Sequence, residues 1–480
     1  MSIYKRFLKD TFIYGLAIVL PRLINFLLVR LHTDNLPNEG FSENTEFYVV
    51  AAFFNVLFTY GLETSFFRFF SQHKDKNKVL STALISILVS TSCFGVLLLG
   101  LSTTISDLLR INPDFYTLLV SITLIDTLVV IPFAYLRVTG KPVKFAIIKL
   151  INVLIIVLLN ILLLSKNYGS ESLRQLIEVE QPVSYIFIAN LVASLTVLAL
   201  VLPYFFKVKL VFDSEVYKQM LKYGWPIMVA GIAFVLNENL DKWLLPVFKG
   251  KAINGAYAAC YKLAVFMTLF IQAFRMGAEP FFFNYAKEKH AKTTYAMIMK
   301  YFVIVGVFGL MLITIYIDLI RPFLIQKESY LIALDIVPLI LLANLCLGIY
   351  HNLSVWYKLT NQTKYGMYIS IMGAAMTIVL NLVFIPKYGF MACAYTTVFA
   401  YGLMMILSYV MGKKHYPVPY DVRRISIYFG YGIITSFSTY YIFDKQIIIG
   451  SVFLLGYLII IWVLEKQDFK RILKSKVSST

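Results

Sequence analysis

The sequence predicts an all-α integral membrane protein of about fourteen transmembrane helices, built as two pseudo-symmetric six-helix lobes followed by two C-terminal helices. Composition is the first of three observations that predict this fold. Of the 480 residues, 59% are hydrophobic and 15% charged, and the mean hydropathy is +0.75, whereas soluble domains are about half apolar and a quarter charged. The second observation is a series of apolar runs of bilayer-spanning length. The third is a set of motifs that recur in register. Together they exclude a soluble enzyme and a disordered chain.

Each apolar run is predicted to be a helix, because only helices and closed barrels satisfy the backbone in lipid and these runs lack the alternation of barrel strands. The predicted spans are 12–31, 46–70, 80–101, 115–136, 146–165, 182–206, 223–247, 254–278, 296–317, 331–357, 365–385, 390–411, 425–443 and 447–464. The basic start followed by an apolar run could be a signal peptide. Pro21 and Arg22 interrupt that run and no small-residue cleavage site follows, so we expect a retained first span.

The net charge of +18 would suggest nucleic-acid binding in a soluble protein. In a membrane protein it is explained by basic loops on the cytoplasmic side. With the N-terminus in the cytoplasm, the inner segments hold three times as many Lys and Arg as the outer loops. The first outer loop has no basic residue but carries the acids Asp34, Glu39, Glu43 and Glu46. The sequence therefore predicts a multi-pass protein with both termini cytoplasmic and without a nucleic-acid partner.

Spans one to six and seven to twelve look like two copies of one six-helix unit. Tyr14 recurs as Tyr223 and Asn160 as Asn381 within matching stretches, and the offset drifts only from 209 to 221. Because six is even, both copies enter the membrane the same way round, which is a parallel repeat typical of transporters. The predicted parts are an N-terminal lobe 1–206, a cytoplasmic linker 207–222, a C-terminal lobe 223–411, and two accessory helices with a basic tail 412–480.

Charged residues inside the predicted spans are the main candidates for function. Burying such a charge in a bilayer costs roughly 2.5–3.5 kcal/mol on insertion scales, so these side chains usually face a protein interior or water. The basic set is Arg22, Arg30, Arg68, Lys149, Lys242, Lys262, Arg275 and Lys300, and the acidic set is Glu63, Asp126, Glu238 and Asp241. Those near span ends, Arg30, Arg68, Arg275 and Lys300, can instead snorkel to the lipid head groups. Arg22 and Asp126 lie near mid-span, where snorkelling is hard.

Arg22 follows Pro21, which can bend the helix, and Asn25 lies three residues on along the same face. A bent helix with Arg and Asn on one stripe favours the wall of a wet cavity, with a structural ion pair as the alternative.

The seventh span carries a dense polar cluster at residues 237–242. Glu238 and Lys242 have the i,i+4 spacing that favours pairing. Asp241 is expected either to pair with a neighbouring helix or to take up a cation or proton. Lys262 of the eighth span is expected at a similar depth in the membrane, where it is a candidate for a second wall of the same cavity. In span two, Glu63 either neutralises Arg68 or titrates.

The excess of buried positive charge suggests an anionic substrate, because guanidinium groups bind phosphate in a bidentate manner. No Walker-type phosphate loop occurs, so ATP is not expected to be the direct energy source. The four cysteines lie singly and predict neither a zinc site nor a disulfide. No cofactor is expected beyond coupling to H⁺ or Na⁺. The many Tyr and Phe rings fit membrane belts and core packing, although sugars also stack on such rings.

Three motifs resemble those of polysaccharide flippases. Gly61–Arg68 resembles the pattern that ends their second helix. Tyr223–Pro226, the pair Asp241-Lys242, and Gly255–Tyr257 resemble their seventh-helix region. Asn381–Gly389 resembles the junction of helices eleven and twelve, although Gly389–Ala394 is bulkier than the usual small-residue run. The chain thus resembles the polysaccharide (lipid-linked oligosaccharide) branch of the multidrug/oligosaccharidyl-lipid/polysaccharide (MOP) flippase superfamily.

The resemblance implies two lobes that work by alternating access in the bacterial plasma (inner) membrane. The implied activity is not enzymatic: it is transfer of an undecaprenyl-pyrophosphate-linked oligosaccharide to the outer leaflet for O-antigen, capsule or exopolysaccharide synthesis. Membrane lipids, and a polysaccharide polymerase and glycosyltransferases, are the implied partners. The expected substrate-binding residues are Arg22, Asn25, Arg68, Lys242, Lys262 and Arg275, and the expected coupling residues are Glu63, Asp126, Glu238 and Asp241.

Three other functions remain open at this stage. A cation-coupled exporter of small drugs predicts acid-lined cavities. A membrane glycosyltransferase or polymerase would use an acidic pair such as Glu178 and Glu180, although their loop is short. A lipid scaffold without transport would have little use for buried charges.

Overall fold

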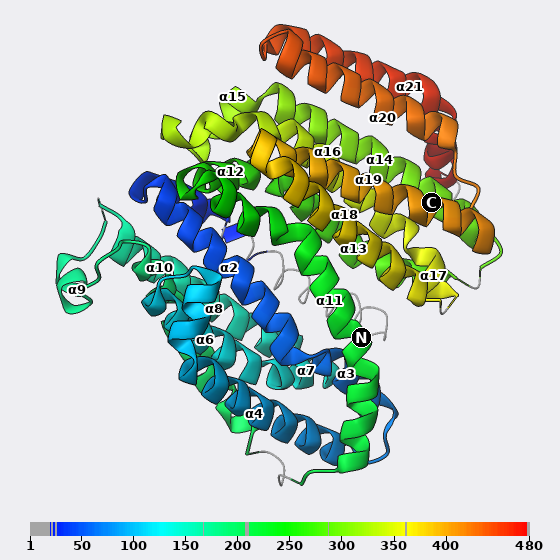
Figure 1. The fold of residues 1–480 in the computed structure, drawn as a ribbon. Coiled ribbons are helices and arrows are strands. Elements are labelled where there is room, and N and C mark those ends of the chain that lie inside the picture. The colour runs from blue at the N-terminus through cyan, green and yellow to red at the C-terminus, as the bar shows by residue number, and fades with distance from the viewer. Residues whose placement is uncertain are drawn as a thin grey trace. The chain divides into compact units, whose positions relative to one another are not determined.

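The computed structural model describes residues 20, 23–24, 26–166, 168–206, 211–286, 288–360 and 362–477. This described part is almost entirely helical and contains no strand (Figure 1). A first helical stretch covers residues 26–35. The further elements, with η marking 3-10 and π turns, are α2 Asn38–Thr59, α3 Leu62–Gln72, α4 Lys76–Gly100, α5 Ser102–Leu109, α6 Pro113–Leu128, α7 Val130–Val138, α8 Pro142–Leu164, α9 Glu171–Leu176, α10 Ser184–Val201, η1 Leu202–Tyr204, α11 Ser214–Lys249, α12 Lys251–Leu263, α13 Val265–Tyr285, α14 Ala291–Ile315, α15 Ile317–Ile320, η2 Arg321–Phe323, η3 Glu328–Ile336, α16 Val337–Leu353, α17 Val355–Leu359, α18 Lys364–Tyr388, α19 Phe390–His415, α20 Val422–Phe437, η4 Ser438–Ile442 and α21 Ile447–Val477.

The predicted class, an all-α integral membrane protein, is confirmed. Eleven helical segments of the described residues are long and apolar enough to cross a membrane, or twelve if the bent pair α12 and α13 is one span. The total of fourteen is not confirmed. The first predicted span, 12–31, lies largely outside the described residues, and the thirteenth corresponds to α20, which has 16 residues and runs into the π turn η4.

Two predicted boundaries shift in the structure. The second span was expected to begin at 46, but α2 begins at Asn38, because its polar first turns find partners within the protein. At Tyr60 and Gly61 the backbone enters the left-handed region, and the span continues as α3. The predicted linker 207–222 is helical from Ser214 onward, as the first turns of the 36-residue α11.

The chain divides into two compact units. Unit 1 comprises residues 1–259 with 327–332 and 377–390, and unit 2 comprises 260–326, 333–376 and 391–480. This division follows contacts, whereas the predicted lobes follow sequence repetition, so those lobes remain a prediction.

In unit 1, α11 packs against α2, α3 and α4, and α10 packs against α6 and α8 (Figure 1). One buried apolar cluster joins α2, α6 and α10 around Phe47, Tyr116 and Phe187. A second joins α3, α4, α7 and α11 around Phe66 and Met220. These clusters fix the helices that carry the polar groups of unit 1.

In unit 2, α14 packs against α16, α20 and α21. A buried charged cluster holds the last two helices in place. The carboxylate of Glu465 on α21 is fully buried, pairs with Lys300 of α14, and accepts hydrogen bonds from Tyr428 (2.8 Å) and Arg424 (3.3 Å) of α20. Breaking a buried pair of this kind costs about 3–5 kcal/mol, so the cluster anchors the accessory helices.

Candidate functional site

Two neighbouring charges on α11, Asp241 and Lys242, are buried in unit 1. Lys242 Nζ lies 3.1 Å from Asp241 Oδ1, and the two side chains are 10% and 5% exposed. Lys242 also donates to the backbone carbonyl of Glu238 at 2.8 Å. From α12, the Tyr257 hydroxyl donates to the other Asp241 oxygen at 2.5 Å. The pair is therefore neutral overall and hydrogen-bonded on both sides, which lowers the cost of burying it.

Helix geometry brings Tyr257 to this pair. α11 ends at Gly250, whose φ of +89° favours glycine, and α12 starts at the next residue. A Cβ added at Gly255 would lie 1.8 Å from the Asn38 carbonyl of α2, so only glycine allows this close approach. Tyr257 was noted in the sequence only as part of a motif, and the structure makes it a direct partner of Asp241.

A second polar group connects α2 with the start of α12. Glu46 accepts from the Ser42 hydroxyl at 2.5 Å, and Asn254 donates to Ser42 at 2.8 Å. Lys251 pairs with Glu43 at 2.9 Å. The sequence was interpreted as placing Glu39, Glu43 and Glu46 in the first outer loop. The structure contradicts this, because all three lie within α2, where Glu46 is buried. The i,i+4 spacing of Ser42 and Glu46 was the signal that could have revealed a helix there.

Glu63 and Arg68 of α3 contact different helices. Glu63 pairs with Arg137 of α7 at 3.0 Å, and both side chains are 41% exposed. The Arg137 guanidinium lies over the Phe67 ring, 4.8 Å from its centroid. The Arg68 guanidinium lies over Tyr223 of α11 at 4.3 Å. The predicted span 115–136 ended one residue before Arg137, which left this residue in the following loop. Its two partners, Glu63 and Phe67, are four residues apart on α3 and so lie on the same face of that helix. No sequence pattern links α3 to α7, so these contacts could not be predicted.

Asp126 of α6 accepts a hydrogen bond from Ser194 of α10 at 2.7 Å. It also interacts electrostatically with Lys149 of α8. The Lys149 ammonium lies 4.5 Å from the centre of the Phe133 ring, and it feels the charges of Glu63 and Arg137 as well. Two acids and two bases from four helices thus share one region of unit 1.

The remaining predicted substrate-binding residues lie outside the described residues or in unit 2. Arg22 and Asn25 lie outside the described residues. Lys262, exposed in the last turn of α12, belongs to unit 2. Arg275 of α13, also in unit 2, lies 3.4 Å from His351 of α16. Within the described part of the chain, no cluster of three or more His, Cys, Asp or Glu residues could hold a metal ion.

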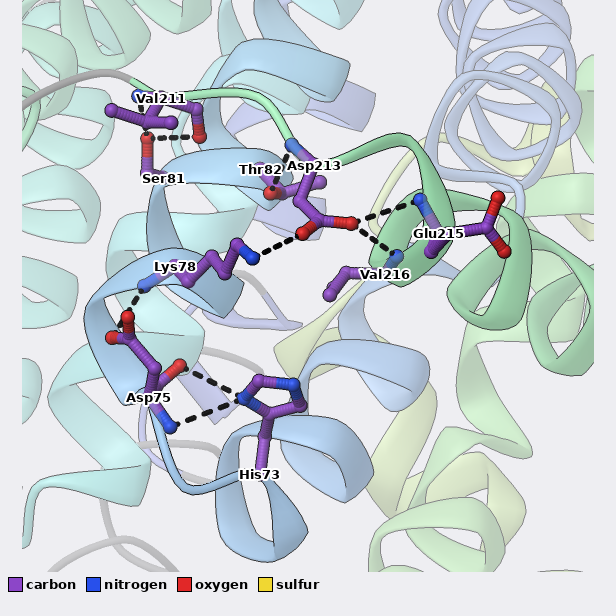
Figure 2. Close-up of polar contacts among 9 residues, drawn as sticks. All are labelled: His73, Asp75, Lys78, Ser81, Thr82, Val211, Asp213, Glu215 and Val216. Atoms are coloured by element: carbon purple, nitrogen blue, oxygen red, sulfur yellow. Dashed lines mark hydrogen bonds and ion pairs between the residues drawn. The ribbon is translucent and has the colours of Figure 1, made fainter.

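A polar joint fastens the start of α11 to the start of α4 (Figure 2). Asp213 pairs with Lys78 at 2.5 Å and caps α11 by accepting from the amides of Glu215 and Val216, both at 2.9 Å. The hydroxyl of Ser81 bonds both polar backbone groups of Val211, at 2.5 and 2.8 Å. These contacts, together with the Asp213 amide bonded to Thr82 at 3.1 Å, are called the α4–α11 joint below.

Next to this joint along α11, the residues Met220 and Gly224 pack closely against α3. Ser65 of α3 donates to the Met220 carbonyl at 2.9 Å. A Cβ on Gly61 would lie 2.3 Å from the Gly224 carbonyl oxygen of α11. This backbone contact sets Tyr223 beside α3, where its ring supports Arg68.

The buried or half-buried acids Glu46, Asp126 and Asp241 each accept a hydrogen bond from a hydroxyl group. The guanidinium groups of Arg68 and Arg137, in contrast, lie over aromatic rings at more exposed positions. Such rings orient a guanidinium without consuming its N–H donors, which suits it to bind an anion. The described residues thus define a class, the multi-pass membrane proteins with an all-helical fold.

Residues 7–285 match the family described as polysaccharide biosynthesis protein. The match extends over more than half of the chain, so this protein belongs to that family. The family resemblance drawn from the sequence motifs is confirmed. No curated protein matches the chain.

Solved structures with similar folds include the lipid II flippase MurJ in an inward closed conformation. It matches with a TM-score of 0.68 and 16% identity, over 95% of this chain and 99% of that one. An inward-facing multidrug resistance MATE transporter of the MOP superfamily matches with a TM-score of 0.65 and 12% identity, over 85% and 95%. A MATE protein in the straight conformation matches at 0.61 and 11%, over 88% and 96%. At these identities the likeness concerns the fold.

Proposed function

We propose that this protein flips an undecaprenyl-pyrophosphate-linked oligosaccharide from the cytoplasmic to the outer leaflet of the bacterial plasma membrane. The oligosaccharide then serves the synthesis of a surface polysaccharide. Family membership and a fold shared with a lipid II flippase support the proposal. The observation that carries it is that two arginines on neighbouring helices of unit 1, Arg68 and Arg137, each have the guanidinium group over an aromatic ring.

The substrate poses a physical problem that this arrangement addresses. A head group of sugars and pyrophosphate cannot cross hydrocarbon alone, because burying its charge without partners is prohibitive. Guanidinium groups offer the fork geometry and permanent charge that phosphate requires. The prenyl tail can remain in lipid while the head passes through the protein by alternating access.

The roles proposed for individual residues follow their chemistry. The substrate's phosphates and sugars would be bound by Arg22, Asn25, Arg68, Lys242, Lys262 and Arg275. The acids Glu63, Asp126, Glu238 and Asp241 are proposed to couple transport to H⁺ or Na⁺. Both termini are proposed to be cytoplasmic, and a polymerase and glycosyltransferases to act before and after the flip.

Complementation of a deletion strain tests the function. We expect Arg68→Ala and Arg137→Ala to reduce surface polysaccharide at normal protein level, while cytoplasmic lipid-linked oligosaccharide accumulates. Lys218→Ala is the matched control, because Lys218 is an exposed base of unit 1 that pairs only at the surface with Glu215. Wild-type surface polymer from both arginine variants would contradict the proposal.

The rival activity, export of cationic drugs, is tested in the same strain. A flippase for an anionic lipid leaves the uptake of cationic dyes unchanged when it is deleted. Increased dye accumulation in the deletion strain, with normal surface polymer, would favour the exporter instead.

A further inference from the structure

The ion pair between Glu63 and Arg137 is poorly suited to a purely structural role. Both side chains are 41% exposed and a single contact of 3.0 Å joins them. Exposed pairs of this kind contribute little to stability. By contrast, the Lys300–Glu465 pair in unit 2 is 8% and 0% exposed and carries further hydrogen bonds. The exposed pair can therefore separate at small cost, whereas the buried one cannot.

We propose that Glu63 is an exchangeable counter-anion of Arg137, which the pyrophosphate of the substrate displaces on binding. The inference rests on the proposed function, and it assigns an exchange of partners to Arg137, one of the two arginines that carry that function. In the empty protein the Glu63 carboxylate occupies the guanidinium. When the lipid-linked substrate arrives, a phosphate group takes that position, and after translocation the carboxylate returns and favours release.

The Phe67 ring explains how Arg137 keeps its geometry during this exchange. The ring lies 4.8 Å from the guanidinium carbon and belongs to α3, one turn after Glu63. This cation–π contact helps to hold the guanidinium in place when an anion replaces the Glu63 carboxylate. When Glu63 moves away, the Arg137 guanidinium therefore keeps its position and can bind the incoming phosphate.

The surrounding charges favour a polyvalent anion over the carboxylate. Lys149 interacts electrostatically with Glu63, Arg137 and Asp126, so the region contains two bases balanced by two acids. A pyrophosphate carries more than one negative charge, and it gains from both bases when it replaces the single charge of Glu63.

The exchange is tested by binding of geranylgeranyl pyrophosphate to the purified full-length protein in detergent, measured by calorimetry. Removing the competing carboxylate with Glu63→Gln should tighten binding about three- to fivefold, the factor expected from a weak exposed pair. Arg137→Ala should weaken binding, and Glu63→Gln should bring no gain in the Arg137→Ala background. Glu215→Gln, which removes a comparable exposed partner from Lys218, should leave affinity unchanged.

A second variant and a second readout separate this role from structural support. Arg137→Lys keeps the positive charge and the pairing with Glu63 but loses the fork, so it should bind the pyrophosphate more weakly with unchanged thermal stability. In cells, Glu63→Gln should bind more tightly yet supply surface polymer more slowly, because release loses its competitor. A merely structural pair predicts lower stability and no gain in affinity.

Two outcomes overturn the inference, and they differ in what they imply for the proposed function. If the wild-type protein binds geranylgeranyl pyrophosphate and Glu63→Gln binds it no more tightly, the exchange is wrong while the flippase proposal stands. If neither protein binds the probe and a deletion strain makes normal surface polymer, both proposals fail.

Discussion

At the scale of single residues, burial decides what each charge can do. Asp241 and Lys242 are nearly inaccessible and are held by Tyr257 and the Glu238 carbonyl. Their separation would leave a bare charge in a low-dielectric interior. Glu63 and Arg137 are each 41% exposed, so another polar group has room to replace either partner. A carboxylate paired with a cation is thus enclosed in α11 and accessible between α3 and α7.

Substituting Lys242 tests the fixed pair. Lys242→Met should lower the free energy of unfolding by about 3–5 kcal/mol, because Asp241 stays buried without its cation. The double variant Asp241→Asn with Lys242→Met should recover part of that loss, since no charge is then stranded. Denaturant unfolding in detergent measures both. A single variant as stable as the wild type would show that Asp241 finds another partner.

The pH dependence of the α4–α11 joint follows from Asp213, which lies before the first residue of α11. Hydrogen bonding from Lys78, followed by the amides of α11, lowers the pKa of Asp213 from 3.8 to about 2. Because the folded-state pKa is the lower one, the stabilisation is present in full above the unfolded pKa and is lost as pH falls through the folded pKa.

We therefore expect wild type to exceed Asp213→Asn in stability by a constant amount above about pH 5. The difference should shrink as the pH falls below about 4, which thermal unfolding across that range measures. A difference that persists undiminished at pH 3 would mean that the charge on Asp213 is not what stabilises the joint.

At the scale of elements, helix termini and breaks follow recognisable local signals. Asp75 caps α4, and Asn112 with Pro113 starts α6. The break between α2 and α3 is different. Gly61 has a φ of +72° and sits against the backbone of α11 at Gly224. The sequence shows a glycine after Tyr60, but the helix that presses on it lies far along the chain, so the reason for the break becomes visible only in the structure.

Gly61→Ala tests this contact. The new Cβ would lie 2.3 Å from the Gly224 carbonyl in a left-handed backbone, so unfolding should become easier by about 1–3 kcal/mol. Gly100→Ala is the matched control at the end of α4, where nothing lies within 4 Å, and it should be neutral or slightly stabilising. Equal melting temperatures for the two variants would contradict the close packing of α3 on α11.

At the scale of the whole molecule, much of the fold could be predicted and little of the site. Apolar length and composition give helices and a membrane, because both depend on local sequence. The exposed or buried state of a charge depends on helices distant in sequence. Glu46 therefore appeared to be a loop acid, and Arg137 a loop base. The i,i+4 spacing predicted that Lys242 pairs with Glu238, whereas in the structure Lys242 pairs with its neighbour Asp241 and donates to the Glu238 backbone carbonyl. The contact of Tyr257 with Asp241 depends on the turn at Gly250 and was not predicted.

The predicted orientation has a direct test in intact cells. In a Cys93→Ser background, which removes the exposed cysteine of the described residues, Ser172→Cys in α9 should react with a membrane-impermeant maleimide. Lys414→Cys, at the end of α19, should react only after permeabilisation, because basic loops stay in the cytoplasm. The reverse pattern would invert the topology and place the arginines of α3 and α7 at the opposite membrane face.

The α4–α11 joint has a consequence for how the polypeptide holds together. The stretch between residues 206 and 211 is the only covalent tie between α10 and α11, yet α11 is independently fastened to α4 through Asp213, Val211 and their partners. Cleavage of the backbone in that stretch would leave α11 bound to α4, because these contacts do not depend on the cleaved peptide bond. Two separately translated fragments meeting there would be expected to reassociate into a working whole.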